Sequence, residues 1–167
     1  MAEKKILVFD KEFTYEGLFL AKEVYRTARN WLEEHDYSPF EFKHEEQLFE
    51  EGKQIYVELQ GEKKLSDYAK ITWISKLTFS QIKNAKIEQN NRTISMNKGK
   101  VKFITMVISN TDWDKTFEQN PFQYFLKVII EKYVFKGYIS RAEKRAKKDY
   151  VAYEDKLKSY LNMNQFR

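Results

Sequence analysis

The residues of this chain that could carry out chemistry lie in two charged segments. The first surrounds the only two histidines, His35 and His44, whose acidic neighbours in the sequence are Asp36, Glu41, Glu45 and Glu46. Imidazole and carboxylate groups can hold a divalent cation or act as general acid and base. The two histidines flank a turn and lack the spacing of a known metal-binding motif, so we predict neither a metal site nor a catalytic site. A carboxylate-based hydrolase around Glu41, His44 and Glu45 is kept as a third hypothesis.

The second charged segment is basic and lies near the C-terminus. Between residues 136 and 158 there are eight Lys or Arg and four Asp or Glu. The cations that would contact phosphate groups are Arg141, Lys144, Arg145, Lys147 and Lys148, and the rings available for stacking are Tyr138, Tyr150 and Tyr153. The acidic residues lie at helical spacing from these cations and favour an ordinary solvated helix face. The segment therefore predicts either a contact with RNA or the ribosome, or a solvated surface.

The composition limits the class of protein. The chain has 167 residues, a formal net charge of +5, 42% hydrophobic residues and no cysteine. A chain of this length can bury a core, so we predict a single domain over residues 1–167. Without cysteine there are no disulfides and no thiolate chemistry, which fits a reducing, cytoplasmic location. The apolar run Ile6–Phe9 is too short for a signal peptide or a transmembrane segment.

The hydrophobic pattern predicts the elements that position these residues. Residues 1–13 have the pattern of a strand or extended arm, and helical spacing of apolar residues predicts a helix over 16–35. Alternation predicts antiparallel strands over 40–109, with turns at Asn90-Asn91 and Asn97–Lys100. Asn120-Pro121 begins a predicted helical segment over 121–161, in which Gly137 predicts a kink or a break.

The order of these elements predicts an α+β fold. An antiparallel sheet of about six strands is expected to be covered on one face by the N-terminal helix and by the long C-terminal helix. Exposed edges of such a sheet can pair between chains, which leaves a homodimer open.

The surplus of aromatic residues supports the first functional hypothesis, which is non-enzymatic binding. An apolar small molecule or protein segment would lie between the sheet and the C-terminal helix, with no cofactor. The residues expected to contact it are Trp73, Phe79, Phe103, Trp113, Phe125 and Tyr133. The same side chains could instead form the core, and Trp113 could close one end of it. The alternative function is binding of RNA or the ribosome by the basic helix.

Several motifs resemble a group of small archaeal proteins to which no activity is assigned. They are Tyr15–Phe19, Trp31-Leu32 followed by Tyr37, Phe40–Phe42, Asn97–Val101 and Asn120–Phe122. The resemblance spans most of the chain and implies an archaeal, intracellular source and one compact domain. The element order is also similar to the helix-grip arrangement of START-like lipid-binding domains. Those domains have two short helices after the first strand, where this sequence predicts one longer helix.

Overall fold

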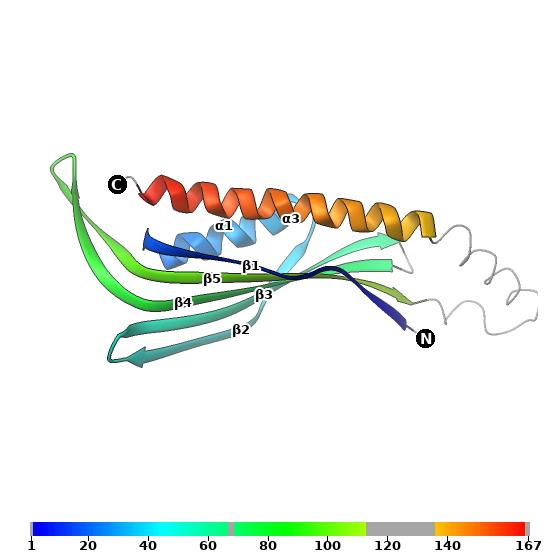
Figure 1. Cartoon of the computed structure of the whole chain (residues 1–167), viewed down its shortest axis with the longest axis horizontal. Coiled ribbons are helices and arrows are strands. Elements are labelled where there is room, and N and C mark those ends of the chain that lie inside the picture. The colour runs from blue at the N-terminus through cyan, green and yellow to red at the C-terminus, as the bar shows by residue number, and fades with distance from the viewer. Residues whose placement is uncertain (1, 67–68, 113–135, 166–167) are drawn as a thin grey trace, which may run out of the picture.

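The computed structural model describes residues 2–66, 69–112 and 136–165, which form an antiparallel sheet with two helices on one face (Figure 1). In chain order the elements are β1 (Ala2–Phe19), α1 (Ala21–Glu34), β2 (Ser38–Phe49), β3 (Gly52–Ser66), β4 (Ala69–Gln89), β5 (Arg92–Asp112) and α3 (Lys136–Gln165). The five strands are ordered β1-β5-β4-β3-β2, and each neighbouring pair is antiparallel. The predicted α+β class with an antiparallel sheet is confirmed.

The two central strands show why one face of the sheet is covered. Alternate residues of β4 and β5 are buried, namely Ile71, Trp73, Ser75, Leu77, Phe79, Val101, Phe103, Thr105 and Val107. Successive side chains of a strand point to opposite faces, so these residues form a single apolar face. Helices α1 and α3 both lie over it (Figure 1). The opposite face is more polar and has no described helix over it, as is common for antiparallel sheets.

Helix α1 begins later than the sequence predicted. The sequence predicts a helix that begins at residue 16. In the structure residues 15–19 pair with β5, from Tyr15 opposite Val101 to Phe19 opposite Asn97. Strand β1 therefore extends beyond residue 13, because pairing with β5 prevails over the local helical period. From Ala21 onward the prediction is correct, and α1 buries Val24, Ala28, Trp31 and Leu32 on one side.

The long hairpin of β4 and β5 replaces two predicted hairpins. Asn90 and Asn91 form its turn with positive φ angles of 50° and 58°. The predicted turn at Asn97–Lys100 is wrong, since these residues pair with β1 on one side, and Asn97, Lys98 and Lys100 also pair with β4 on the other. Residues 85–89 and 93–96, expected as separate strands, are the distal parts of β4 and β5. This continuity brings the described strands to five, close to the expected number.

Helix α3 carries the predicted apolar stripe. Ala142, Ala146, Tyr150, Tyr153, Leu157 and Leu161 are buried at helical spacing. Gly137 is the second residue of α3, and a Cβ added at this position would meet no atom closer than 3.9 Å. The expected cap Asn120 and the predicted helical residues 121–135 lie outside the described residues. Neither described helix combines the length and apolar content needed to cross a membrane.

The edge strand β2 is exposed along almost its whole length. It contains Glu41, Glu45 and Glu46 of the first charged segment, together with Lys43 and His44. Charged side chains on an edge strand oppose pairing with another chain. The homodimer stays a prediction.

Candidate functional site on the C-terminal helix

The aromatic residues assigned to a ligand cavity contact other rings of the protein. Trp73 is fully buried, and its ring centroid lies 5.3 Å from those of Trp31 and Tyr37 and 5.2 Å from that of Tyr153. These four rings come from α1, the loop before β2, β4 and α3. They occupy the centre of the space between the sheet and the helices.

The other described residues that were predicted to contact a ligand also pack on rings of the protein. Phe79 packs on Phe19 with a centroid distance of 5.7 Å, and Phe103 stacks on Phe13 at 4.4 Å. Trp113, Phe125 and Tyr133 lie outside the described residues. The apolar-ligand hypothesis stays a prediction, and the rings that the structure does describe are packed as core.

Two hydrogen bonds fix α3 against the rest of the domain. The hydroxyls of Ser75 and Tyr153 are 2.6 Å apart in the core, and the Tyr37 hydroxyl donates to Asp149 Oδ2 at 3.2 Å. Desolvation raises the pKa of both tyrosines, and the Asp149 carboxylate raises that of Tyr37 further. These contacts define which side of α3 faces inward.

The acidic residues near the middle of α3 are bound by neighbours at the flanks of the helix. Glu143 accepts hydrogen bonds from Lys147 at 2.9 Å and from Lys5 of β1 at 3.4 Å, which together lower the pKa of its carboxyl. Glu154 pairs with Lys158, and Asp149 accepts from Tyr37. Three of the four carboxylates between residues 136 and 158 therefore have partners other than Arg141, Lys144, Arg145 and Lys148.

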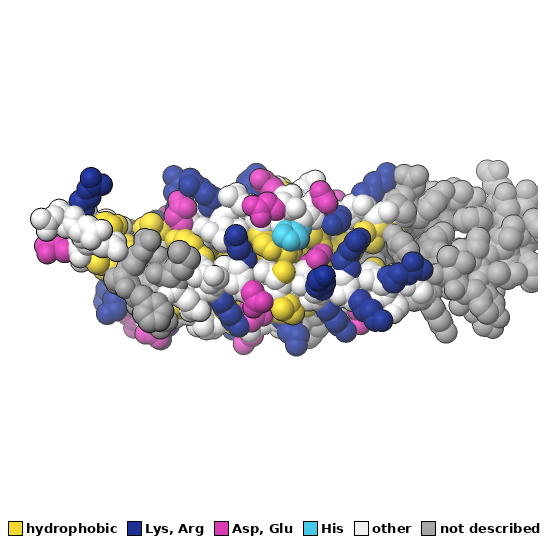
Figure 2. All heavy atoms as spheres, turned by 90° about the horizontal axis from the view of Figure 1, so that it is seen from above, with side chains coloured by type: hydrophobic (Ala, Val, Ile, Leu, Met, Phe, Trp, Pro, Cys, Tyr) yellow, Lys and Arg dark blue, Asp and Glu magenta, His cyan; other side chains and the backbone are white. Residues whose placement is uncertain are grey.

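Four of the five predicted phosphate-contacting cations lie on the outer side of α3. Arg141, Lys144, Arg145 and Lys148 are exposed. Arg141, Lys144 and Lys148 lie opposite the buried stripe, and Arg145 lies at its flank, near the Tyr37 hydroxyl. Among the described residues none of them forms an ion pair with a carboxylate; Arg141 instead donates to the Gly137 carbonyl oxygen. Figure 2 views this side of the molecule, and Lys and Arg side chains predominate near the end where α3 begins. We call these four residues the basic face. The fifth cation, Lys147, is the partner of Glu143.

No protein-family model and no curated protein matches this chain. The resemblance to archaeal proteins and the similarity to START-like domains therefore stay predictions.

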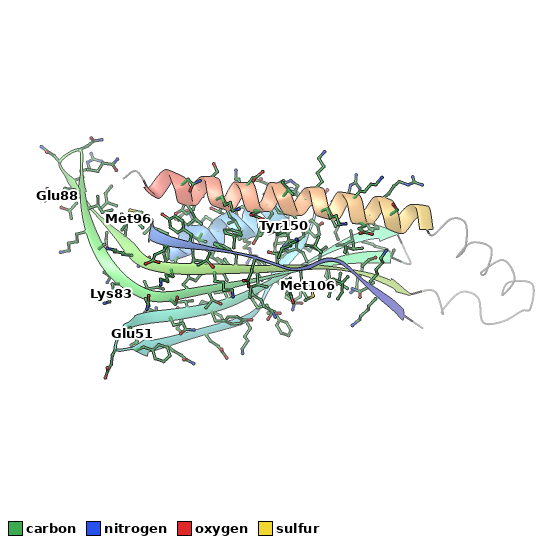
Figure 3. All side chains as sticks on the ribbon, viewed as in Figure 1. Glu51, Lys83, Glu88, Met96, Met106 and Tyr150 are labelled. Carbon is green, nitrogen blue, oxygen red and sulfur yellow. The ribbon has the colours of Figure 1, made fainter. Side chains whose placement is uncertain are left out.

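The predicted stacking role is wrong for two tyrosines. Tyr150 and Tyr153 belong to the buried stripe, and Tyr153 is 0% exposed. Figure 3 shows Tyr150 between α3 and the sheet. The side chain of Tyr138 lies outside the described part of the chain. The basic face therefore presents charge without either of these two rings for base stacking.

The side chains of the first charged segment, around His35 and His44, do not come together in one site. His35 stacks on Trp31 with a centroid distance of 3.9 Å, whereas His44 lies on β2 within 3.4 Å of Glu41 and 3.2 Å of Glu46. Glu45 pairs with Lys43 on the same exposed strand. No group of three His, Asp or Glu side chains in the described ranges has a geometry suited to a metal ion. The geometry does not support the hydrolase hypothesis, because Glu41, His44 and Glu45 are exposed along an edge strand.

A second cluster of cations was missed at the sequence level. Lys83, Lys98 and Lys100 line one hollow at a bend in β4 and β5. The segment Asn97–Lys100 looks like a turn in the sequence, so its lysines were not assigned to a strand. The signal was the alternation that continues through Lys98, Lys100 and Lys102 into the clear strand that follows.

Proposed function

We propose that the protein binds nucleic acid, with RNA as the favoured partner, through the basic face of α3. The observation that supports the proposal most is the separation of charge on this helix. The acidic side chains near the middle of α3 have partners at its flanks or inside, whereas Arg141, Lys144, Arg145 and Lys148 present four positive charges to solvent. A patch of like charge without internal partners is suited to a polyanion.

The dimensions of the basic face suit a phosphate backbone. Residues 141–148 extend about 10 Å along a helix axis at a rise of about 1.5 Å per residue. Nucleic acid binding through such contacts releases counterions, and the logarithm of affinity falls with the logarithm of salt concentration by about 0.7 to 0.9 per neutralised phosphate. With four contacts we expect a slope of about −3.

A nucleic acid fits this surface better than a membrane does. Helices that lie on membranes bury an apolar face in the bilayer beside their basic residues. On α3 the apolar stripe is already buried against the rest of the domain, and Val151 is the single large hydrophobic residue of the described part of α3 that is exposed. Because Tyr150 and Tyr153 are buried, the contacts are made to phosphates. Binding is therefore expected to depend little on sequence.

The apolar-ligand alternative is less favoured for a specific reason. Its described residues, Trp73, Phe79 and Phe103, are at most 1% exposed and pack on other rings of the chain. A ligand would have to displace these contacts.

The experiment is a salt titration of binding to fluorescein-labelled single-stranded RNA, duplex RNA and duplex DNA, followed by anisotropy. The test variant combines Arg141→Gln, Lys144→Gln and Lys148→Gln. Between about 50 and 200 mM salt we expect the wild-type slope of about −3 to fall by about 2 in this variant. Arg145 is retained because its charge lies near the Tyr37 hydroxyl and offsets part of the rise that burial causes in the pKa of Tyr37.

A matched control removes the same charge elsewhere. Lys22 on α1, Lys43 on β2 and Lys76 on β4 are replaced by Gln, which lowers the net charge equally without touching the basic face. We expect the control to retain the wild-type slope. Equal losses in the two triple variants would show a general charge effect and overturn the proposal, as would wild-type binding that does not weaken with salt.

A further inference from the structure

The long hairpin is bent at a β-bulge. Between Ser80 and Lys83, β4 has two residues, Gln81 and Ile82, opposite the single Gly99 of β5. A bulge of this kind bends a strand and increases its twist. Gln81 has a φ of 54°, and beyond it the hairpin curves toward the C-terminal end of α3 (Figure 1).

Two hollows adjoin at this bend on the side of the sheet away from the helices. Ser80 and Lys100 alternate with the buried residues Phe79 and Val101, so they point to the helix-free face. One hollow has a volume of about 580 Å³ and the other about 410 Å³. They share Glu51, Gln81 and Lys100 and therefore form one elongated depression.

The smaller hollow is lined by three lysines and by two carboxylates, those of Glu16 and Glu51. Lys83 and Lys98 lie directly opposite each other in the ladder, an arrangement that is unfavourable for like charges. Neither forms an ion pair within the described part of the chain. Lys100, the third lysine, pairs with Glu16 at 3.5 Å; the two side chains are 44% and 72% exposed, and such solvated pairs contribute little stability. A bound anion would relieve the repulsion between the lysines.

The larger hollow offers a different chemistry. Its lining includes Phe49, which is 54% exposed although its side chain is large and apolar. Two carboxylates, those of Glu50 and Glu51, also line it. An exposed aromatic ring beside a hollow that contains lysines can stack on a nucleobase. Figure 3 shows Glu51 and Lys83 at this same end of the molecule, from the β2–β3 turn and from β4.

We propose that this depression binds a nucleoside phosphate, with the phosphate held by Lys83, Lys98 and Lys100 and the base placed against Phe49. Lysine ammonium groups bind phosphate as point charges. The Gln81 side-chain amide donates one hydrogen bond to Glu51 at 3.2 Å and has a second N–H to offer. The ligand is a free nucleotide or the end of an RNA strand, which share this chemistry. The site is separate from the basic face of α3, so the two proposals stand or fall independently.

The test is a titration of isotopically labelled protein with AMP, with inorganic phosphate and with adenosine, followed by amide NMR shifts. We expect saturable shifts at Gln81, Lys83, Lys98 and Lys100, with AMP binding more tightly than phosphate or adenosine. In the double variant Lys83→Gln with Lys98→Gln, we expect AMP affinity to fall about tenfold. This variant also removes the like-charge pair, so without ligand its melting temperature should equal or exceed that of the wild type.

A matched control keeps the charge change on the same hairpin. Lys86 and Arg92 are exposed, lie beyond the bend and do not line either hollow. Replacing both by Gln should leave AMP binding unchanged. The proposal is overturned if AMP causes no saturable shifts, if the Lys83/Lys98 variant binds as the wild type does, or if the control loses equal affinity.

Two further comparisons test whether the nucleobase contacts Phe49 and whether the ligand is a free nucleotide or the end of an RNA strand. Phe49→Ala should weaken AMP and leave phosphate unaffected; equal affinity of the wild type for phosphate and AMP would overturn the nucleoside part of the proposal. A short RNA that carries a 5′-phosphate is then titrated. Tighter binding than AMP at the same amides assigns the site to a strand end, and equal or weaker binding assigns it to a free nucleotide.

Discussion

The hydroxyl groups of Ser75 on β4 and Tyr153 on α3 are 2.6 Å apart, and both side chains are fully buried. The two residues are 78 positions apart in the sequence, so this hydrogen bond joins the centre of the sheet to the C-terminal helix. Tyr153 also packs edge-on against Trp31 and Trp73. The pair fixes the rotation of α3 about its axis and thereby turns the basic face outward.

Removal of either hydroxyl should leave its partner buried without a hydrogen bond. We expect Tyr153→Phe and Ser75→Ala each to lower the free energy of unfolding by about 1–3 kcal/mol. The double variant should cost less than the sum, with a coupling energy of at least about 0.5 kcal/mol. Urea denaturation of the wild type, the two single variants and the double variant gives the four free energies of this double-mutant cycle. Strict additivity would mean that the hydroxyls do not interact.

The stability of the protein should fall at alkaline pH. Burial raises the pKa of Tyr153 above the value of 10.0 expected in the unfolded chain. Above pH 10 the unfolded chain therefore releases a proton that the folded protein retains, which favours unfolding. A single such group lowers the free energy of unfolding by up to about 1.4 kcal/mol per pH unit within this window.

The tyrosine contribution can be isolated with Tyr153→Phe. Urea denaturation at about pH 9 to 11 should show a shallower decline in this variant than in the wild type, by about 1 kcal/mol per pH unit above pH 10. Below pH 9 the two curves should run parallel. Identical slopes above pH 10 would contradict the burial of this hydroxyl.

The bend in the hairpin requires a residue without a side chain at position 99. A Cβ on Gly99 would lie 2.7 Å from the Ser80 carbonyl oxygen and 3.1 Å from that of Gln81. We expect Gly99→Ala to lower the free energy of unfolding by about 1–3 kcal/mol. Gly137→Ala is the control, because its Cβ would meet nothing closer than 3.9 Å and alanine favours the helix. It should be neutral or stabilising by less than about 1 kcal/mol.

The orientation of α3 can be tested through its two sides. Leu157 is fully buried, and Leu157→Ala should cost about 2–5 kcal/mol. Val151 is 55% exposed, and Val151→Ala should change stability by no more than about 0.5 kcal/mol. Thermal or urea denaturation distinguishes the two. Similar costs for both would mean that the helix is rotated and that the basic face is not outward.

Local periodicity in the sequence determined a large part of the fold. The alternation in residues 71–79 and 101–107 identified the central strands, and the helical spacing of Ala142, Tyr153 and Leu161 identified the buried side of α3. It also located the cations of the basic face. These features are readable because an element that buries one face repeats its apolar residues at the period of its backbone.

The tertiary structure decided what depends on residues far apart in the chain. Residues 15–19 continue β1 because they pair with residues 97–101, and Asn97–Lys100 forms strand for the same reason. Asp149 of α3 accepts a hydrogen bond from Tyr37, 112 residues away, and Glu143 contacts both its helical neighbour Lys147 and Lys5 of β1, 138 residues away. Helical spacing alone accounts for the pair of Glu143 and Lys147. The contacts of Asp149 with Tyr37 and of Glu143 with Lys5 exist only in the packed protein, because they join elements that are far apart in the chain.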